Sequence, residues 1–474
     1  MLLSSMSSVD IESLATDFYG LIQSFYHAPL YHIILEILLF FAVMWLLFFR
    51  KPRPIEKKLT EKEKQELIDE WQPEPLVPTV DPNHPALNVR ILDGPVGKYI
   101  TIDNEQSLNF ASLNFLNFVG NERIQSKSIQ AVQKYGVGSC GPRGFYGTID
   151  IHLELEERLA RFFGCEEGII YSYGFSTIAS IIPAYSKRND VIFVDEGVHY
   201  AIQKGIEASR SNIKWFKHND LDDLERLLIE QENLDKKNIK KARATRRFLI
   251  VEGLYMNYGD LCPLPRMVEL KYKYKYRIFI DESVSFGTIG QTGRGITEYY
   301  NIDRQQIDLI SSTLEYAAGS IGGFAVGSSF VVDHQRLSAQ GYCFSASLPP
   351  LLAAAAIEAL NIMEENSDLF ETLMYKSEQL HNKLIAIKGY IIQGDYLSPL
   401  KHIRLPNEFN TTGRLESIVH FAQTKHITIT VARYLQDEHV LPQPSIRLIL
   451  NVDITEEEMD FLCAVLQEAL VVTI

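Results

Sequence analysis

The chain has 474 residues, of which 46% are hydrophobic and 22% are charged, enough apolar material for a globular protein of two or more domains. Its 60 acidic and 46 basic residues give a formal net charge of −14, which argues against nucleic acid as a partner, because phosphate binding requires a basic face. The five cysteines include no C-x-x-C pair and therefore indicate neither a zinc site nor a disulfide framework.

Residues 1–32 contain a helical pattern of apolar residues and no Lys or Arg. The apolar positions are Leu14, Phe18, Leu21, Ile22 and Phe25. This spacing predicts an amphipathic helix lying on the lumenal membrane surface, with burial against a partner as the alternative.

Residues 33–49, IILEILLFFAVMWLLFF, carry a single charge, Glu36. At 1.5 Å per residue the segment is about 26 Å long, close to the hydrocarbon thickness of a bilayer. Basic residues follow at once, beginning with Arg50 and Lys51, so the positive-inside rule predicts a lumenal N-terminus and a cytosolic remainder. We expect an uncleaved, single-pass transmembrane helix, in which Glu36 either snorkels to the interface or contacts another membrane subunit.

Residues 50–105 have the composition of a cytosolic linker and N-terminal arm. Thr60 and Glu63 have the spacing of a capping box, which predicts a short charged helix from about residue 61 to Trp71. A series of prolines from Pro73 onwards then predicts an extended arm, either a spacer or a segment that wraps a partner.

Short β-rich runs alternate with helical segments in the next part of the chain. The runs are GIIYSY, VIFVD, RFLIVEG and RIFID. This alternation predicts an α/β domain with a mostly parallel sheet over residues 106–350, and a long helix after Pro350 leads into a smaller α+β domain over residues 351–474. The basic segment 236–247, KKNIKKARATRR, is interpreted as a solvated loop or as a contact for anionic headgroups.

Short motifs follow one another along this region. They are YGVGSCGPRGFYG (135–147), His152 to Glu156, YSYGF (171–175), Asp195 to His199, KHND (217–220), VEGLYMNYGD (251–260), IDESVSFG (280–287), GRG (293–295) and FSASLPP (344–350). The ordered set covers about three quarters of the chain and resembles the α-oxoamine synthases. In that family a pyridoxal phosphate (PLP) enzyme joins an amino acid to an acyl-CoA with loss of carbon dioxide. The resemblance implies PLP-dependent transferase fold type I.

One departure from the family lies in residues 308–324, DLISSTLEYAAGSIGGF, which resemble the lysine-bearing loop. Tyr316 stands at the lysine position, and a phenol cannot form a Schiff base or move protons as an amine does. Glu315 replaces a hydroxyl residue and would repel a phosphate. We therefore expect no covalent PLP on this chain and no catalytic residue in it.

Other positions of the family's PLP site are partly retained. Asp281 matches the residue that pairs with the pyridinium nitrogen, His199 the residue that stacks on the ring, and Thr313 a phosphate-contacting hydroxyl. Val284 replaces a histidine. These residues and Tyr316 are interpreted as vestigial, and Arg447, which resembles a carboxylate-binding arginine of active relatives, as structural.

The resemblance further implies a dimer in which this chain completes the site of its neighbour. FSASLPP resembles a segment that crosses to the neighbouring cofactor, so Ser345, backed by Ala346, is predicted to contact the partner's PLP phosphate. Cys140, Gly141 and Arg143 are predicted to belong to a loop shared between the subunits, in which Cys140 packs as a small residue.

Within the family, the chain is similar to the lysine-less, non-catalytic but obligatory subunit of a membrane-bound heterodimer. Implied partners are a lysine-bearing catalytic subunit 2 that holds the PLP, a small activating subunit and Orm-type regulators. The complex would act on L-serine and palmitoyl-CoA at the endoplasmic reticulum membrane. The alternatives are a scaffold or regulator with no part in catalysis, and an autonomous synthase that uses another amine, which Tyr316 opposes.

Overall fold

The computed structural model describes residues 19–20, 23, 29–49, 59–77, 79–80, 82, 87 and 89–473. The chain divides into two units, Met1–Asn88 and Val89–Ile474, which are described separately. The predicted lumenal helix and the basic residues that follow the membrane segment lie outside the described residues.

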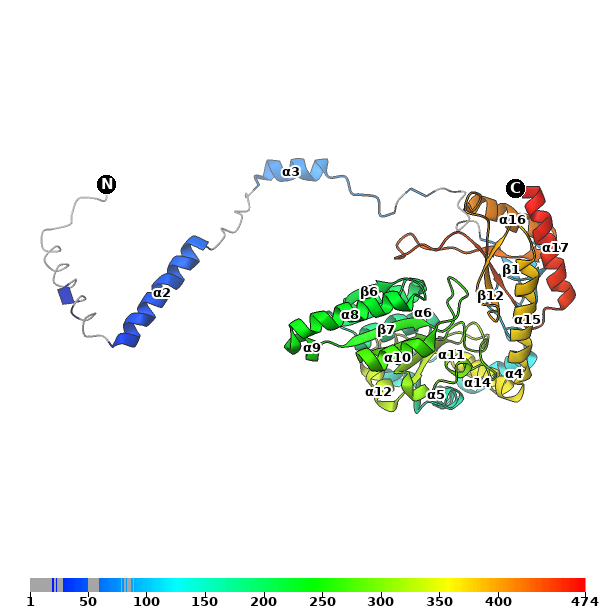
Figure 1. Ribbon diagram of the computed structural model, residues 1–474, viewed down its shortest axis with the longest axis horizontal. Coiled ribbons are helices and arrows are strands. Elements are labelled where there is room, and N and C mark those ends of the chain that lie inside the picture. The colour runs from blue at the N-terminus through cyan, green and yellow to red at the C-terminus, as the bar shows by residue number, and fades with distance from the viewer. Residues whose placement is uncertain are drawn as a thin grey trace. The chain divides into compact units, whose positions relative to one another are not determined.

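Among the described residues of the first unit are helices α2 (Leu30–Phe49) and α3 (Glu61–Glu70), both drawn in blue in Figure 1. Helix α2 is apolar on all sides, and its residues Leu30–Phe48 are long and hydrophobic enough to cross a membrane. Helix α3 begins with the predicted capping box, since the Thr60 side chain accepts from Glu63 N and the Glu63 carboxylate accepts from Thr60 N. The prediction of this short charged helix is confirmed.

The second unit is built on a seven-stranded sheet with the order β4-β10-β9-β8-β7-β5-β6. Its strands are β4 (Glu167–Tyr171), β5 (Val191–Asp195), β6 (Asn212–Phe216), β7 (Arg247–Glu252), β8 (Arg277–Asp281), β9 (Leu309–Thr313) and β10 (Gly323–Gly327). Only β10 runs antiparallel to its neighbours. The predicted mostly parallel sheet is confirmed, and β4, β5, β7 and β8 coincide with the predicted runs within two residues at either end.

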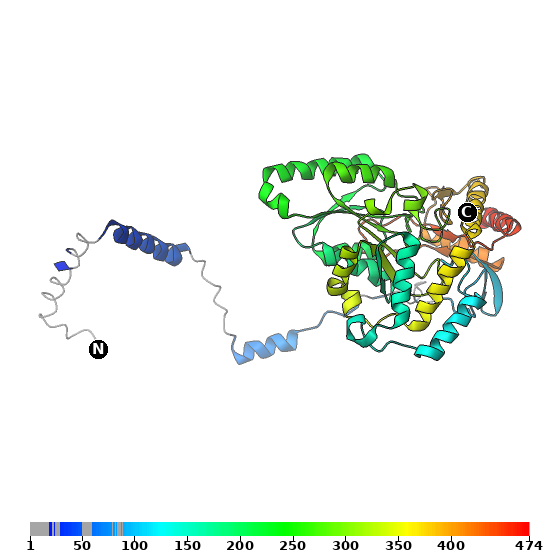
Figure 2. The ribbon, with the colours of Figure 1, turned by 90° about the horizontal axis from the view of Figure 1, so that it is seen from below.

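Helices lie on both sides of this sheet (Figures 1 and 2). They are α4 (Glu122–Tyr135), α5 (Asp150–Phe163), α6 (Gly174–Tyr185), α7 (Tyr200–Ser209), α8 (Leu221–Lys237), α9 (Ile239–Ala244), α10 (Leu264–Tyr274), α11 (Ile296–Tyr299), α12 (Ser329–Ser338), α13 (Gln340–Cys343) and α14 (Pro350–Glu365). Pro350 occupies the first turn of α14, where its missing N–H costs no hydrogen bond. Helix α14 packs against α4 and α5.

Two smaller sheets complete the second unit. One has the order β11-β12-β15-β14 and is antiparallel throughout, with β11 (Ile391–Gln393), β12 (Leu400–Arg404), β14 (Thr430–Val431) and β15 (Ile446–Ile449). The other joins β1 (Leu92–Asp93), β2 (Tyr99–Ile102) and β3 (Glu105–Asn109) to β13 (Ile427–Thr428). Helices α15 (Asp368–Ile385), α16 (Thr412–Thr424) and α17 (Glu456–Thr473) accompany them, as the predicted smaller α+β domain requires. The predicted domain boundaries stay predictions.

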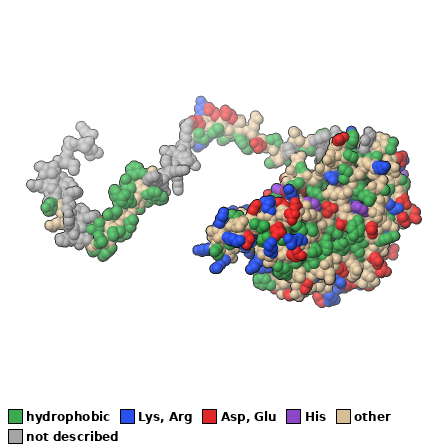
Figure 3. Space-filling model, in the orientation of Figure 1, with side chains coloured by type: hydrophobic (Ala, Val, Ile, Leu, Met, Phe, Trp, Pro, Cys, Tyr) green, Lys and Arg blue, Asp and Glu red, His purple; other side chains and the backbone are tan. Residues whose placement is uncertain are grey.

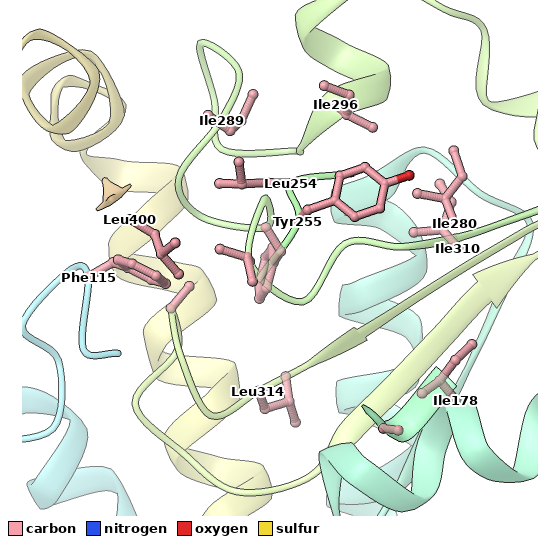
Figure 4. Close-up of a cluster of buried hydrophobic side chains, with 14 of the residues drawn as sticks. Phe115, Ile178, Leu254, Tyr255, Ile280, Ile289, Ile296, Ile310, Leu314 and Leu400 are labelled. Carbon is pink, nitrogen blue, oxygen red and sulfur yellow. The ribbon is translucent and has the colours of Figure 1, made fainter. Parts of the chain in front are cut away.

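The hydrophobic core is continuous from the large sheet to the small domain. Its strands read as apolar runs because a sheet covered on both faces buries every side chain, as in β5, where all five residues are buried. Figure 4 shows part of this core. The labelled side chains are Phe115, Ile178, Leu254, Tyr255, Ile280, Ile289, Ile296, Ile310, Leu314 and Leu400. This packing fixes the ends of β7, β8 and β9, from which the site residues project.

Candidate functional site

The candidate site lies at the carboxyl edge of the parallel strands, where ligands bind in open α/β sheets. Glu252, Asp281 and Thr313 are the last residues of β7, β8 and β9. A cavity of about 270 Å³ at this edge is lined by Asp281, Thr313 and residues of other elements, while Glu252 contacts the lining residue His199. Its lining includes five predicted positions, His199, Asp281, Val284, Thr313 and Tyr316, together with Glu315 and Arg447.

No lysine lines this cavity in the part of the chain that the structure describes. Burial and nearby carboxylates raise the pKa of Tyr316 well above its usual range, so its hydroxyl stays protonated at neutral pH. Lys204, one of the two amines nearest to the motifs, instead forms ion pairs with Asp437 (2.7 Å) and Glu207 (2.9 Å). Lys217, the other, is not in the lining.

His199 is held between two buried carboxylates. Its backbone N–H donates to Glu252 Oε1 (2.6 Å), and its Nδ1 accepts from Ala201 N (3.2 Å) as the N-cap of α7. The ring proton of the neutral form is therefore on Nε2, which lies 3.8 Å from Asp281 Oδ2. Burial alone would lower the pKa of His199, but Glu252 and Asp281 raise it to about 9. Burial would raise the pKa of Asp281, but His199 and hydrogen bonds from Ser283 keep it below its usual range.

Glu315 occupies the N-terminus of α6. Its carboxylate Oε1 accepts from Gly174 N (3.2 Å), the first residue of that helix, where an anion would otherwise bind. Gly174 has room for no side chain, because an added Cβ would collide with Thr313 Oγ1. The Thr313 hydroxyl itself donates to Gly322 O (3.1 Å) and accepts from Glu315 N (3.2 Å). An internal carboxylate thus takes the place of an external anion.

PLP fits this cavity poorly. A covalent link would require an amine where Tyr316 lies, and the cofactor phosphate would meet the Glu315 carboxylate at the helix N-terminus. Val284, buried where the family has a histidine, offers no hydrogen bond. Asp281, His199 and Thr313 are the positions of the family's PLP site that this cavity retains.

The sequence did not assign a role to several other residues of the cavity. Glu252, which ends β7 and accepts from the lining residue His199, was a motif residue without a function. Tyr434 and Glu438, which line the cavity, belonged to no motif. Arg447, interpreted as structural, also lines the cavity and forms no ion pair among the described residues. Arg447 lies on β15, and Tyr434 and Glu438 lie in the loop between β14 and β15, whose approach to the large sheet no local pattern predicts.

A second group of predicted residues meets away from the cavity. Ser347 N and Oγ both donate to Gly141 O (3.0 Å each), and Ser139 Oγ donates to Ser347 O (3.0 Å). The Ser172 hydroxyl donates to Ala346 O. The glycine-rich loop 135–147 and the segment 344–350, more than 190 residues apart in sequence, therefore form one surface.

On this surface the predicted residues differ in exposure. Cys140 and Ala346 are exposed, and Ser345 is half-buried with no hydrogen bond from its hydroxyl among the described residues. Arg143 points inward, where its guanidinium forms a bidentate ion pair with Glu156 (2.8 and 3.0 Å). Arg143 thus holds the loop from inside, while Cys140 and Ser345 remain available to a neighbour.

Large aromatic side chains project from the same two segments. Tyr146 is fully exposed, Phe344 is 80% exposed and Phe145 is 68% exposed. Soluble surfaces rarely expose such a group, and where they do it is typical of a contact site for another protein, a ligand or a membrane. Loop 135–147 and segment 344–350 therefore form an exposed apolar surface.

Known relatives share this architecture. Residues 105–466 match the family model for aminotransferase class I and II. Long chain base biosynthesis protein 1b of Oryza sativa subsp. japonica is 45% identical over 374 residues, 79% of this chain and 77% of the relative. Serine palmitoyltransferase 1 of Dictyostelium discoideum is 41% identical over 422 residues, 86% of this chain and 87% of the relative.

Solved structures show the same fold. A serine palmitoyltransferase from S. paucimobilis superposes with a TM-score of 0.74 at 22% identity, covering 87% of this chain and 96% of that one. The Sphingomonas wittichii enzyme gives the same values. The chain therefore belongs to the aminotransferase class I and II family and, within it, to the group of serine palmitoyltransferase 1 and long chain base biosynthesis protein 1.

Proposed function

We propose that this chain is the non-catalytic, obligatory subunit of a serine palmitoyltransferase. The complex condenses L-serine with palmitoyl-CoA to 3-oxosphinganine, the first step of sphingolipid biosynthesis. The observation that carries the proposal is the cavity itself, which has Tyr316 at the lysine position and no lysine in its described lining. The catalytic amine is therefore supplied by a lysine-bearing partner subunit.

The partner also holds the PLP, which supplies an electron sink for the reacting amino acid. This chain helps to position the partner's cofactor and the segments that contact the partner. The Ser345 hydroxyl, free of internal hydrogen bonds among the described residues, donates to the phosphate of the partner's cofactor, backed by Ala346. The Gly141–Ser347 hydrogen bonds keep loop 135–147 and segment 344–350 in register against the partner.

Helix α2 anchors the complex. Its length and apolar character support a single-pass span. The basic residues from Arg50 onwards favour a lumenal N-terminus, and the family resemblance favours the endoplasmic reticulum membrane. We place the contacts with Orm-type regulators and with a small activating subunit in the same membrane. Glu36 of α2 is a candidate residue for a contact with another membrane subunit.

Co-expression tests the proposal. The purified chain alone, the pair, and the pair whose partner lacks its lysine are assayed for condensation of serine with palmitoyl-CoA. Activity is expected only in the intact pair. Activity of the lone chain, or of the pair without the partner's lysine, would overturn the assignment.

A substitution separates site completion from scaffolding. Ser345→Ala is expected to lower the activity of the pair at least tenfold without changing its assembly, because one charge-assisted hydrogen bond to phosphate contributes about 1.5–3 kcal/mol. Ser329→Ala, on the exposed start of α12, is the matched control. Equal activities of the two variants would favour a scaffold with no part in catalysis.

A further inference from the structure

The amino edge of the parallel sheet, opposite the cavity, collects basic residues. In a parallel sheet the residues that precede each strand meet at one edge. Arg188 lies shortly before β5, Arg210 before β6, Arg246 before β7 and Lys275 before β8. Helix α9, which leads into β7, adds Lys240, Lys241 and Arg243, and the end of α8 adds Lys236 and Lys237. We call this set the amino-edge patch.

Most cations of the patch have no ion-pair partner. Every member is exposed. Lys236 pairs with Glu232 and Arg246 with Asp190, but the structure, within its described residues, gives no salt bridge to the others. The unpaired members are Arg188, Arg210, Lys237, Lys240, Lys241, Arg243 and Lys275. Their charges are free to act on an external anion.

The carboxylates near this edge are already occupied. Asp190 is paired with Arg246 (3.0 Å), and Asp235 lies between Arg247 Nε and Nη2 (3.0 and 2.5 Å). Asp308 binds Lys271 (2.5 Å) and Arg277 (3.1 Å). The local excess of positive charge therefore stands out in a chain whose net charge is −14.

Apolar side chains are interspersed with these cations. Ile239 at the start of α9 is 62% exposed and Leu234 in α8 is 54% exposed. Figure 3 shows blue side chains concentrated at the end of the globular unit where Figure 1 places α9. A cationic surface with a few projecting apolar groups has the chemistry of a bilayer contact, in which phosphates meet the cations and apolar side chains enter the headgroup boundary.

Helix α2 would keep the globular unit of the chain near a bilayer. Residues 50–88 separate α2 from the globular unit. With α3 helical at about 1.5 Å per residue and the rest extended at roughly 3.3 Å per residue, they reach at most about 110 Å. With α2 in a membrane, the patch is confined to that distance, and a weak contact becomes effectively intramolecular.

We propose that the amino-edge patch binds the anionic surface of the bilayer that holds α2. The contact orients the sheet so that its amino edge faces the headgroups and the carboxyl edge, with the cavity, faces away. The inference uses the membrane span of the proposed function, but it does not depend on which subunit carries the catalytic lysine.

The test is hydrogen exchange on the full-length pair in lipid nanodiscs. Amides of residues 234–244 are compared in nanodiscs of phosphatidylcholine alone and with about 30% phosphatidylserine. Exchange is expected to slow at least about fivefold in the anionic nanodiscs, since each basic residue near such a surface contributes about 1 kcal/mol. The slowing should vanish in about 0.5 M salt, where the screening length falls to a few ångströms.

Two charge-matched variants locate the effect. K240E/K241E should abolish the lipid-dependent slowing, whereas K127E/K388E, which makes the same change of net charge at two exposed positions outside the patch, should retain it. Both should keep the condensation activity of the pair in detergent, which reports on folding.

Three outcomes would overturn the proposal. Equal exchange in the two nanodiscs would mean that no anionic lipid contact exists. Slow exchange that persists in detergent would mean that the partner subunit covers the patch. An equal loss of the lipid-dependent slowing in both charge variants would mean that overall charge, rather than this surface, governs the contact.

Discussion

Two adjacent residues decide the chemistry of the cavity. Tyr316 removes the amine, and Glu315 fills the anion position at the N-terminus of α6 through Gly174 N. The second change matters as much as the first, because a carboxylate at a helix N-terminus is itself stabilised by the helix dipole. The Glu315 carboxylate therefore occupies the N-terminus of α6, where the anionic group of a ligand would otherwise bind.

Restoring the lysine should therefore not restore cofactor binding by itself. We predict that Tyr316→Lys takes up no PLP that borohydride can fix, since Glu315 still repels the phosphate. The double variant Tyr316→Lys/Glu315→Ser should gain such PLP, which mass spectrometry of the reduced peptide would locate. Stoichiometric labelling of the single variant would show that Glu315 does not guard the site.

The Arg143–Glu156 pair offers a second residue-scale prediction. Both side chains are almost fully buried, and loss of one partner leaves an uncompensated charge. Arg143→Met should cost about 3–5 kcal/mol of stability, measured by thermal unfolding of the pair. Arg143→Met/Glu156→Gln should recover part of this loss, but not all, because the Glu156 carboxylate also lies 3.8 Å from Arg336 and the glutamine loses that ionic contact as well. No recovery would mean that the ion pair is not what holds loop 135–147.

At the scale of elements, a charged cluster ties together the ends of neighbouring strands. Asp195 ends β5, His218 follows β6, and Asp260 follows β7. His218 Nδ1 lies 2.8 Å from Asp195 Oδ1, and its Nε2 lies 3.5 Å from Asp260 Oδ2. Burial opposes protonation, but the two carboxylates prevail and raise the pKa of His218 from 6.5 to about 9.

This cluster gives a pH dependence of stability. Because the folded pKa exceeds the unfolded one, the stabilisation is complete below about pH 6.5 and is lost as the pH rises through 9. The gap in unfolding temperature between the parent and His218→Gln should therefore be widest near pH 6 and shrink towards pH 9.5, corresponding to about 3 kcal/mol at most. The exposed His420→Gln serves as control, and a gap that grows with pH would contradict the account.

Sequence patterns predicted individual helices and strands better than they predicted which of them come together in the folded chain. The apolar runs of β5, β7 and β8 and the capping box of α3 were identified because they are local signals. Strand β6, NIKWF, was not, since it is an edge strand with only one fully buried residue. His199, Asp281, Val284, Thr313 and Tyr316 line one cavity. Arg447, which the family resemblance singled out but which was interpreted as structural, lines it too, and Glu438 reaches it through tertiary packing, which leaves no local pattern.

At the scale of the whole molecule, two faces serve two purposes. The carboxyl edge of the large sheet holds a cavity whose described lining includes no lysine, and the surface of loop 135–147 and segment 344–350 exposes aromatic side chains. An apolar helix, α2, long enough to span a membrane, precedes both in the chain. This division suits a subunit that supports chemistry performed on another chain.

The most direct test of this account is the location of PLP in the co-purified pair. After borohydride reduction, pyridoxyl-labelled peptides from both subunits are identified by mass spectrometry. The account predicts label on a partner lysine and none on this chain. A pyridoxyl-lysine in residues 89–474 of this chain would show that another amine serves in place of Tyr316, and the central claim would fail.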